Sequence, residues 1–151
     1  MKHLVNWLVA VFILTASINA NAQDVMIARS KLAFPEAMSA LQNTIIEHSY
    51  TLSRVQRIDI GLTKAGYKTD MYRVVFFGKH EELKWMSDKY PGLAAYLPMK
   101  IAIFAEQGET VAVALNPKHY SDVENQKKLN IIFRRWENDI KSILSDFRKA
   151  D

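Results

Sequence analysis

The C-terminal segment carries the pattern that most restricts what this chain can fold into. Apolar residues recur there at spacings of three and four, which is the period of a helix with one buried face. The stripe consists of Leu129, Ile132, Phe133, Trp136, Ile140, Ile143, Leu144 and Phe147. Charged residues fill the opposite side, and Ser121 with Glu124 matches the capping box that marks a helix start. We therefore predict one long amphipathic helix that covers part of the core.

The preceding segments alternate between the periodicities of strands and helices. Strands are predicted over residues 24–32, 51–60, 71–77, 100–105 and 110–115, and helices over 35–48 and 81–90. The run MYRVVFF over 71–77 is apolar almost throughout and predicts a well-buried strand, whereas 61–69 is a turn-rich connection. The last two strands flank a tight loop containing Gly108, which predicts a hairpin. The expected order is β-α-β-β-α-β-β-α, an α+β domain with an antiparallel sheet and helices on one face.

The first 22 residues have the features of a secretory signal peptide. A short basic start precedes an apolar run over residues 4–16, which is shorter than the ~20 residues of an ordinary membrane span. Ala20-Asn21-Ala22 fits a small-x-small cleavage site before Gln23. An uncleaved anchor is the alternative, although no basic stop-transfer cluster follows. We expect a single domain over 23–151, without stable membrane insertion, in the periplasm of a Gram-negative host or secreted from another host.

Composition excludes several classes of protein. The chain is 49% apolar and has no cysteine, which excludes a disordered tail, a disulfide scaffold and a thiol enzyme. The net charge is +4, and it falls to +3 when Lys2 leaves with the signal peptide. Such mild basicity in an exported protein argues against nucleic acid as a partner.

Two runs resemble a known family, namely VQRIDIGLTKAGYKTDMYRVVFFGKHEE and YPGLAAYLPMKIAIFAEQGETVAVALNP. The pieces YRVVFFGK, YPGLAAYLP, KIAIFAE and ALNP, in this order, are similar to the family named domain of unknown function 302. The likeness is to an exported, single-domain branch of that family. It implies a fold similar to that of TATA-binding protein, often in dimers, without implying DNA binding. It implies no catalytic residues.

The densest polar cluster lies around the second and third predicted strands. Its candidate ligand-binding residues are Arg57, Asp59, Tyr67, Asp70, Tyr72 and Arg73. Arg57 and Asp59 are two apart on a predicted strand, so we expect them to share a face. Guanidinium groups bind oxyanions in a bidentate manner, and phenols orient a ligand, so one hypothesis is an anion or carboxylate site. The alternatives are a structural set of ion pairs at a solvated sheet edge, and an enzyme that uses this cluster.

A second candidate region is aromatic and interrupted by proline. Its residues Trp85, Tyr90, Tyr96 and Met99 would form one wall of an apolar pocket or a dimer contact, where such residues are enriched. The alternative interpretation is a lid over the core.

Histidines and methionines give no metal-binding pattern. His48, His80 and His119 show no i,i+3 or i,i+4 pair, and Met71, Met86 and Met99 lie in apolar runs that indicate core packing. We therefore predict no cofactor and no metal, and keep a haem or metal carrier as the redox alternative. The leading hypothesis is a non-catalytic domain that binds a small ligand, a periplasmic protein or a second copy of itself.

Overall fold

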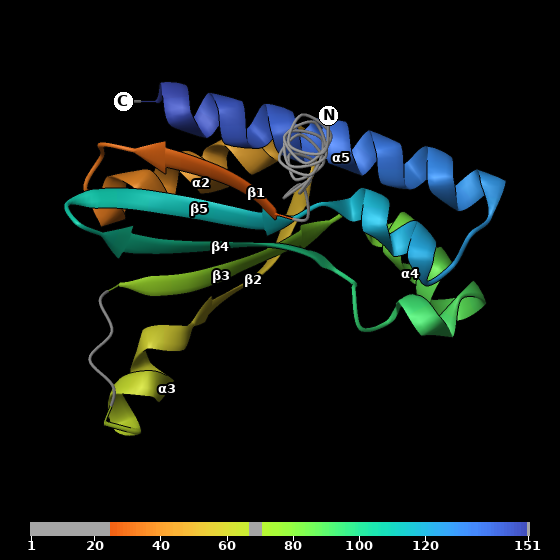
Figure 1. Ribbon diagram of the computed structural model, residues 1–151, viewed down its shortest axis with the longest axis horizontal. Coiled ribbons are helices and arrows are strands. Elements are labelled where there is room, and N and C mark those ends of the chain that lie inside the picture. The colour runs from red at the N-terminus through yellow and green to blue at the C-terminus, as the bar shows by residue number, and fades with distance from the viewer. Residues whose placement is uncertain (1–24, 67–70, 151) are drawn as a thin grey trace, which may run out of the picture.

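The computed structural model describes residues 25–66 and 71–150, which form a sheet with helices packed against one side (Figure 1). The strands are β1 (Val25–Ser30), β2 (Thr51–Arg57), β3 (Tyr72–Gly78), β4 (Met99–Glu106) and β5 (Glu109–Leu115). The helices are α2 (Phe34–Glu47), α3 (Ile58–Lys64), α4 (His80–Lys89) and α5 (Lys127–Lys149), with short 3-10 helices η1 (Pro91–Leu93) and η2 (Pro117–Asp122). The predicted signal peptide falls outside the described residues.

The five strands form one antiparallel sheet in the order β1-β5-β4-β3-β2. β4 and β5 are joined by Gln107 and Gly108, both with positive φ, as a two-residue hairpin loop requires. The predicted hairpin and the α+β class with an antiparallel sheet are confirmed. No helix of the described residues is long and apolar enough to cross a membrane.

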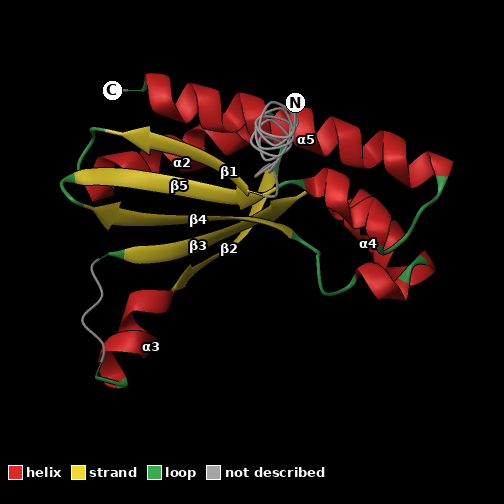
Figure 2. Cartoon of the chain, viewed as in Figure 1, coloured by secondary structure: helices red, strands yellow, loops and turns green. Residues whose placement is uncertain are grey.

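The core lies between the sheet and two helices, α2 and α5 (Figure 2). All eight residues of the predicted apolar stripe on α5 are buried, because the stripe faces the sheet and α2. α2 starts with Phe34-Pro35, and Pro35 suits its place in the first turn because proline has no N–H to satisfy there. Helices therefore cover one face of the sheet, as predicted, while its other face carries no helix formed by residues 25–66 or 71–150.

Three local predictions are wrong. α5 begins at Lys127, so Ser121 and Glu124 do not cap it, and the Ser121 hydroxyl instead donates to the Lys118 carbonyl within η2. The strand predicted over 51–60 ends at Arg57, and an unpredicted helix, α3, follows, so the expected element order lacks one member. Ile58 and Leu62 lie four apart and face the same side of α3, which is a helical spacing. The alternation over residues 51–60 masked it, because that alternation is typical of a strand.

The strand predicted to be well buried is buried on one face alone. Val75 and Phe77 of β3 are inside the core, whereas Tyr72, Val74 and Phe76 point the other way and are partly exposed. An apolar run of this kind is expected when both faces of a sheet are covered, yet here helices cover one face. The apolar character of the second face thus remains to be explained by function.

Candidate functional site

The uncovered face of the sheet, which we call the outer face, is the most unusual surface of the molecule. Beyond Glu106 and Glu109 at the hairpin, the strand register places fourteen side chains there in three rows: Arg29, Val111, Phe104 and Tyr72; Ile27, Val113, Ala102, Val74 and Gln56; Val25, Leu115, Lys100, Phe76 and Arg54. Ten of them are apolar or aromatic. In an open antiparallel sheet the solvent side ordinarily alternates to polar residues, so this composition indicates a binding surface.

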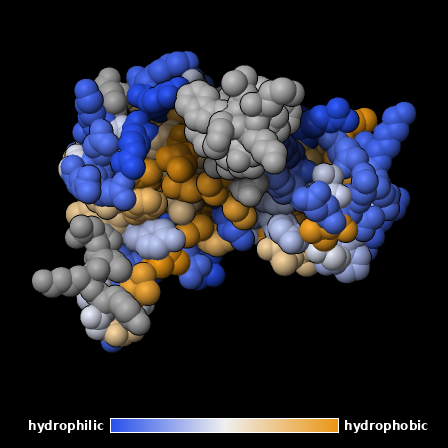
Figure 3. Space-filling model, in the orientation of Figure 1, coloured by the Kyte–Doolittle hydropathy of each residue, from blue (hydrophilic) through white to orange (hydrophobic). Residues whose placement is uncertain are grey.

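Exposure confirms that this surface is open. Ile27 is 58% exposed, Leu115 47% and Val25 43%. Figure 3 shows hydrophobic residues gathered over the strands, with hydrophilic residues around them. The remaining apolar residues of the outer face are half-buried by their neighbours, apart from the buried Val111. Tyr72 and Phe104 pack edge to face on this surface, with 5.9 Å between their ring centroids.

Charges lie at the two ends of the outer face. At the hairpin end, Arg29 donates to Glu106 at 2.7 Å and to Glu109 at 3.4 Å, which leaves one net negative charge. At the opposite end, Lys100 and Arg54 lie in the last row and carry two positive charges. The face is therefore an apolar band with an acidic end and a basic end.

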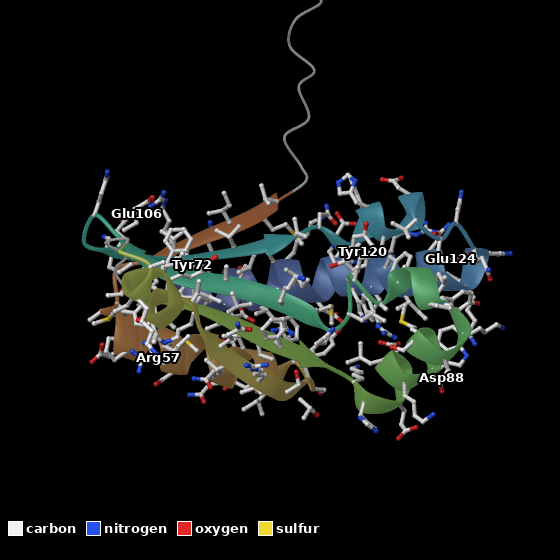
Figure 4. All side chains as sticks on the ribbon, turned by 90° about the horizontal axis from the view of Figure 1, so that it is seen from below. Arg57, Tyr72, Asp88, Glu106, Tyr120 and Glu124 are labelled. Carbon is white, nitrogen blue, oxygen red and sulfur yellow. The ribbon has the colours of Figure 1, made fainter. Side chains whose placement is uncertain are left out.

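The predicted polar cluster comes together in part. Arg73 donates to the carboxylate of Asp59, and Arg57 lies 3.5 Å from the same carboxylate, so α3 is tied to β3. The Asp59 carboxylate is held there by a helix rather than by the strand that sequence predicted. Tyr72 lies on the other side of the sheet from Arg57 (Figure 4). Tyr67 and Asp70 fall outside the described residues.

The electrostatics of this cluster fit a structural ion pair. The hydrogen bond from Arg73 holds the pKa of Asp59 below its usual value, so the carboxylate is charged at neutral pH. Arg73 also lies over the Phe34 ring, 5.5 Å from its centroid. Arg57, Asp59 and Lys64 line an open groove of about 470 Å³. With Arg73 occupied by Asp59 and Phe34, the cluster offers no paired guanidinium groups aimed at an anion.

The aromatic segment divides between core and surface. Tyr90 and Met99 are buried in the core, so they are not available to a ligand. Trp85 packs against Tyr90 at 5.5 Å and against the Lys128 ammonium at 4.2 Å, which ties α4 to α5. Tyr96 packs on Tyr120 at 5.0 Å, and the two line an open groove of about 360 Å³ beside Leu115. Burial raises the pKa of Tyr120.

The candidate metal ligands have local partners. His48 Nε2 lies 3.0 Å from Asp146, and His119 Nδ1 lies 3.6 Å from Asp122. Met86 and Met99 are in the core, as predicted, whereas Met71 is 48% exposed, so the predicted core packing is wrong for that residue. Within residues 25–66 and 71–150, no group of three His, Cys, Asp or Glu side chains could hold a metal ion.

Sequence reasoning missed a polar network where α4, α5 and the start of β2 meet. Glu82 accepts from Arg135 at 2.5 Å and from the Trp136 indole at 2.9 Å. Tyr50 donates to Asp139 at 2.5 Å, and burial together with this bond raises the tyrosine pKa. The network of Glu82 fixes α4 against α5 and faces no groove among those described above.

An open groove of about 670 Å³ lies between η2 and α5. Its lining is mixed in charge: Lys118, His119, Ser121, Asp122, Asn130, Phe133, Arg134 and Glu137. Two basic residues, Lys118 and Arg134, and two acidic residues, Asp122 and Glu137, line this groove, so its lining has no net formal charge. Lys141 and Asn116 also bind Glu137, and the hydrogen bond from Lys141 lowers its pKa.

Together, these features define an α+β domain with a five-stranded antiparallel sheet, four main helices and one open apolar face. The model of the family described as domain of unknown function DUF302 matches residues 26–147, and the chain belongs to that family. It is also similar to a solved structure, that of an uncharacterized conserved DUF302 protein from Bacillus stearothermophilus. The TM-score is 0.74 at 15% identity, over 84% of this chain and 100% of the other. No curated protein matches the sequence.

Proposed function

We propose that this protein is an exported, non-catalytic domain that binds another protein through the outer face of its sheet. One observation carries this proposal: an apolar face, bordered by charge, that the helices of the described residues leave uncovered. Small-molecule sites are usually deep and concave, whereas flat apolar surfaces are typical of protein contacts. The open sheet offers such a flat surface, whereas the groove between η2 and α5 and the groove beside α3 are open and lined largely by polar residues.

The proposal of export rests on the signal-peptide pattern of the first 22 residues. An exported domain would reside in the periplasm of a Gram-negative host or outside the cells of another host. The mature protein then begins at Gln23, which N-terminal sequencing of the protein from its host would detect. A protein that begins at Met1 would contradict export by this route.

We also propose that the fold is similar to that of TATA-binding protein. Superposing the sheet and helices of this domain on those of TATA-binding protein tests this similarity. Kinship of fold does not carry DNA binding with it. The outer face supports the same conclusion, since its middle row is apolar apart from Gln56 and carries no basic residue.

Thiol labelling tests whether the outer face is covered in the native compartment. The chain has no cysteine, so a single introduced cysteine reports one position. Ile27 on the outer face is 58% exposed, and Ile131 on the solvent side of α5 is 59% exposed, which makes a matched pair. We expect Ile27→Cys to react several-fold more slowly than Ile131→Cys in the native compartment, and at a similar rate in dilute purified protein.

Similar rates at both positions in the native compartment would contradict the proposal, because a covered face must slow the reaction. Denatured samples of the two variants control for the intrinsic reactivity of each thiol. Thermal unfolding of each purified variant controls for folding.

A further inference from the structure

We infer that the free edge of β1 binds an extended, acidic segment of a partner protein as a sixth strand of the sheet. This inference goes beyond the proposed function, because it concerns the edge of the sheet and does not require the outer face to be covered. β1 is the first strand in the order of the sheet, so β5 pairs with one of its two sides (Figure 1). Alternate residues of β1 direct their backbone N–H and C=O groups away from β5. No strand of residues 25–66 or 71–150 pairs with that side.

The edge of β1 is regular enough to pair with another strand. All six residues from Val25 to Ser30 pair with β5 in an unbroken register, and the strand contains no proline or glycine. Its one charged residue, Arg29, donates to Glu106 of β4 and Glu109 of β5, so the guanidinium lies over those strands and not over the free edge. Proteins usually block an edge strand with charge, proline or a bulge, and β1 uses none of these devices.

The opposite edge of the sheet is blocked. The register of β2 shifts between Leu52 and Arg54, which is typical of a bulge that disrupts pairing at an edge. β2 also carries a second arginine, Arg57, and leads directly into α3. This contrast between the two edges favours β1 as the one that accepts another strand.

A groove beside β1 receives one row of side chains from the added strand. It has a volume of about 220 Å³ and is lined by Met26, Ile27, Ala28, Lys141, Leu144, Ser145 and Arg148. The lining therefore comes from β1 and α5, and Leu144 contributes a buried apolar residue. Successive side chains of a strand point to opposite faces of the sheet. One row of the added strand would enter this groove, and the other row would lie beside Val25 and Ile27 on the outer face.

The charges of this groove favour acidic side chains. Its lining contains two basic residues and no acidic residue. Glu137 binds Lys141 at 2.8 Å, whereas no described residue forms an ion pair with Arg148. An acidic side chain that enters the groove can therefore pair with Arg148. A second copy that paired through its own β1 would bring no such charge, because β1 has no acidic residue.

Fluorescence anisotropy of a labelled peptide tests the inference on the purified mature protein. The probe is a capped peptide of four valine–glutamate repeats, which places glutamates in the groove and valines on the outer face. The matched control has four valine–lysine repeats. We expect the acidic peptide to bind with a dissociation constant of about 10–500 μM, the weak range of a short segment that is ordered on binding. The basic peptide should bind at least about 10-fold more weakly.

A charge reversal tests the role of the groove. Arg148→Glu should weaken binding of the acidic peptide by at least about 3-fold, because it replaces an attraction by a repulsion. Lys127→Glu makes the same change in net charge at an exposed position, about 30 Å away along α5, and should leave binding unchanged. Thermal unfolding verifies that each variant folds.

Amide hydrogen exchange followed by NMR tests strand addition itself. When the protein is saturated with the acidic peptide, the amides of alternate residues in β1 should exchange at least about 10-fold more slowly. These are the amides that point away from β5, and they would donate to the added strand. The amides of β2 should exchange at an unchanged rate. Saturation with peptide that leaves every amide of β1 unchanged would overturn strand addition.

Three further results would overturn the inference. The first is no binding of the acidic peptide at about 1 mM, above the expected range. The second is equal binding of the acidic and basic peptides. The third is equally tight binding of a peptide with the sequence of β1, which would indicate a second copy as the occupant. If the acidic peptide does not bind while position 27 is protected in the native compartment, strand addition is wrong and the proposed function stands. If the peptide binds and position 27 is not protected there, the proposed function alone fails.

Discussion

At the scale of single residues, the ion pair between Asp59 and Arg73 determines where α3 lies. Both side chains are 15% exposed, and Arg57 adds a second positive charge near the same carboxylate. α3 buries none of its own side chains completely. Because so little apolar packing holds this helix, we infer that the ion pair contributes much of its attachment to the sheet.

Asp59→Asn should therefore lower the free energy of unfolding at neutral pH. The pKa of Asp59 is lowered in the folded state, so its contribution is present above the unfolded pKa of about 4. That contribution is lost as the pH falls through the folded pKa. The difference between wild type and variant in urea unfolding should then shrink in acid. A difference that grew in acid would contradict the pairing. Asp88→Asn, in the exposed pair with Lys84, is the control.

Gly78 is required at the end of β3 by a close approach of α4. A Cβ atom there would lie 2.3 Å from Leu83 Cδ1 and 2.9 Å from Leu83 Cγ, so the whole side chain would have to move. We expect Gly78→Ala to destabilise the fold by about 1–3 kcal/mol through overpacking. Gly61→Ala, with open space around it inside α3, should be neutral or slightly stabilising. Chemical denaturation of both variants measures the contrast, and equal effects would contradict it.

At the scale of elements, α5 is the helix that organises the core. Its apolar stripe contacts β1 and α2, and its charged side faces solvent. Ile143 is fully buried, so Ile143→Ala should cost about 2–5 kcal/mol. Ile131→Ala, on the exposed side of the same helix, should change stability by less than about 0.5 kcal/mol. Urea unfolding compares the two, and similar losses would mean that the stripe faces elsewhere.

How far sequence predicts an element depends on what holds the element in place. The apolar stripe of α5 was predictable because burial of one helix face makes apolar residues recur every three or four positions along many residues. α3 was not, because seven residues give too short a pattern, and its position depends on an ion pair with β3. The capping box failed for a related reason, since Ser121 bonds to the nearer Lys118 carbonyl within η2.

The outer face could have been found from the sequence with one further step. The strands of residues 71–77, 100–105 and 110–115 are apolar on both faces, yet the sequence also predicts helices on one face alone. Those two conclusions together leave apolar surface uncovered. The acidic and basic ends of the outer face could not be predicted from the sequence. Their position depends on the strand register, which places Glu109 beside Glu106 and Arg29.

At the scale of the whole molecule, the fold has two layers, namely the sheet and the helices on one of its faces. The sheet is apolar on both faces, as is usual for a sheet that is covered on both sides. α2 and α5 supply the second layer, and the proposed partner would supply the third. A partner that binds the folded state stabilises it by mass action. The melting temperature of wild type should therefore be higher in the native compartment than in dilute purified protein, and this difference should be smaller for Ile27→Glu. A wild-type melting temperature that is the same in both conditions would contradict the proposed partner.

The central claim is that the outer face is covered when the protein works. The ratio of thiol-labelling rates at positions 131 and 27, measured in the native compartment, tests it most directly because the two residues are equally exposed in the isolated chain. The account predicts a ratio well above one in the native compartment that falls to near one in dilute purified protein. A ratio near one in both conditions would contradict it.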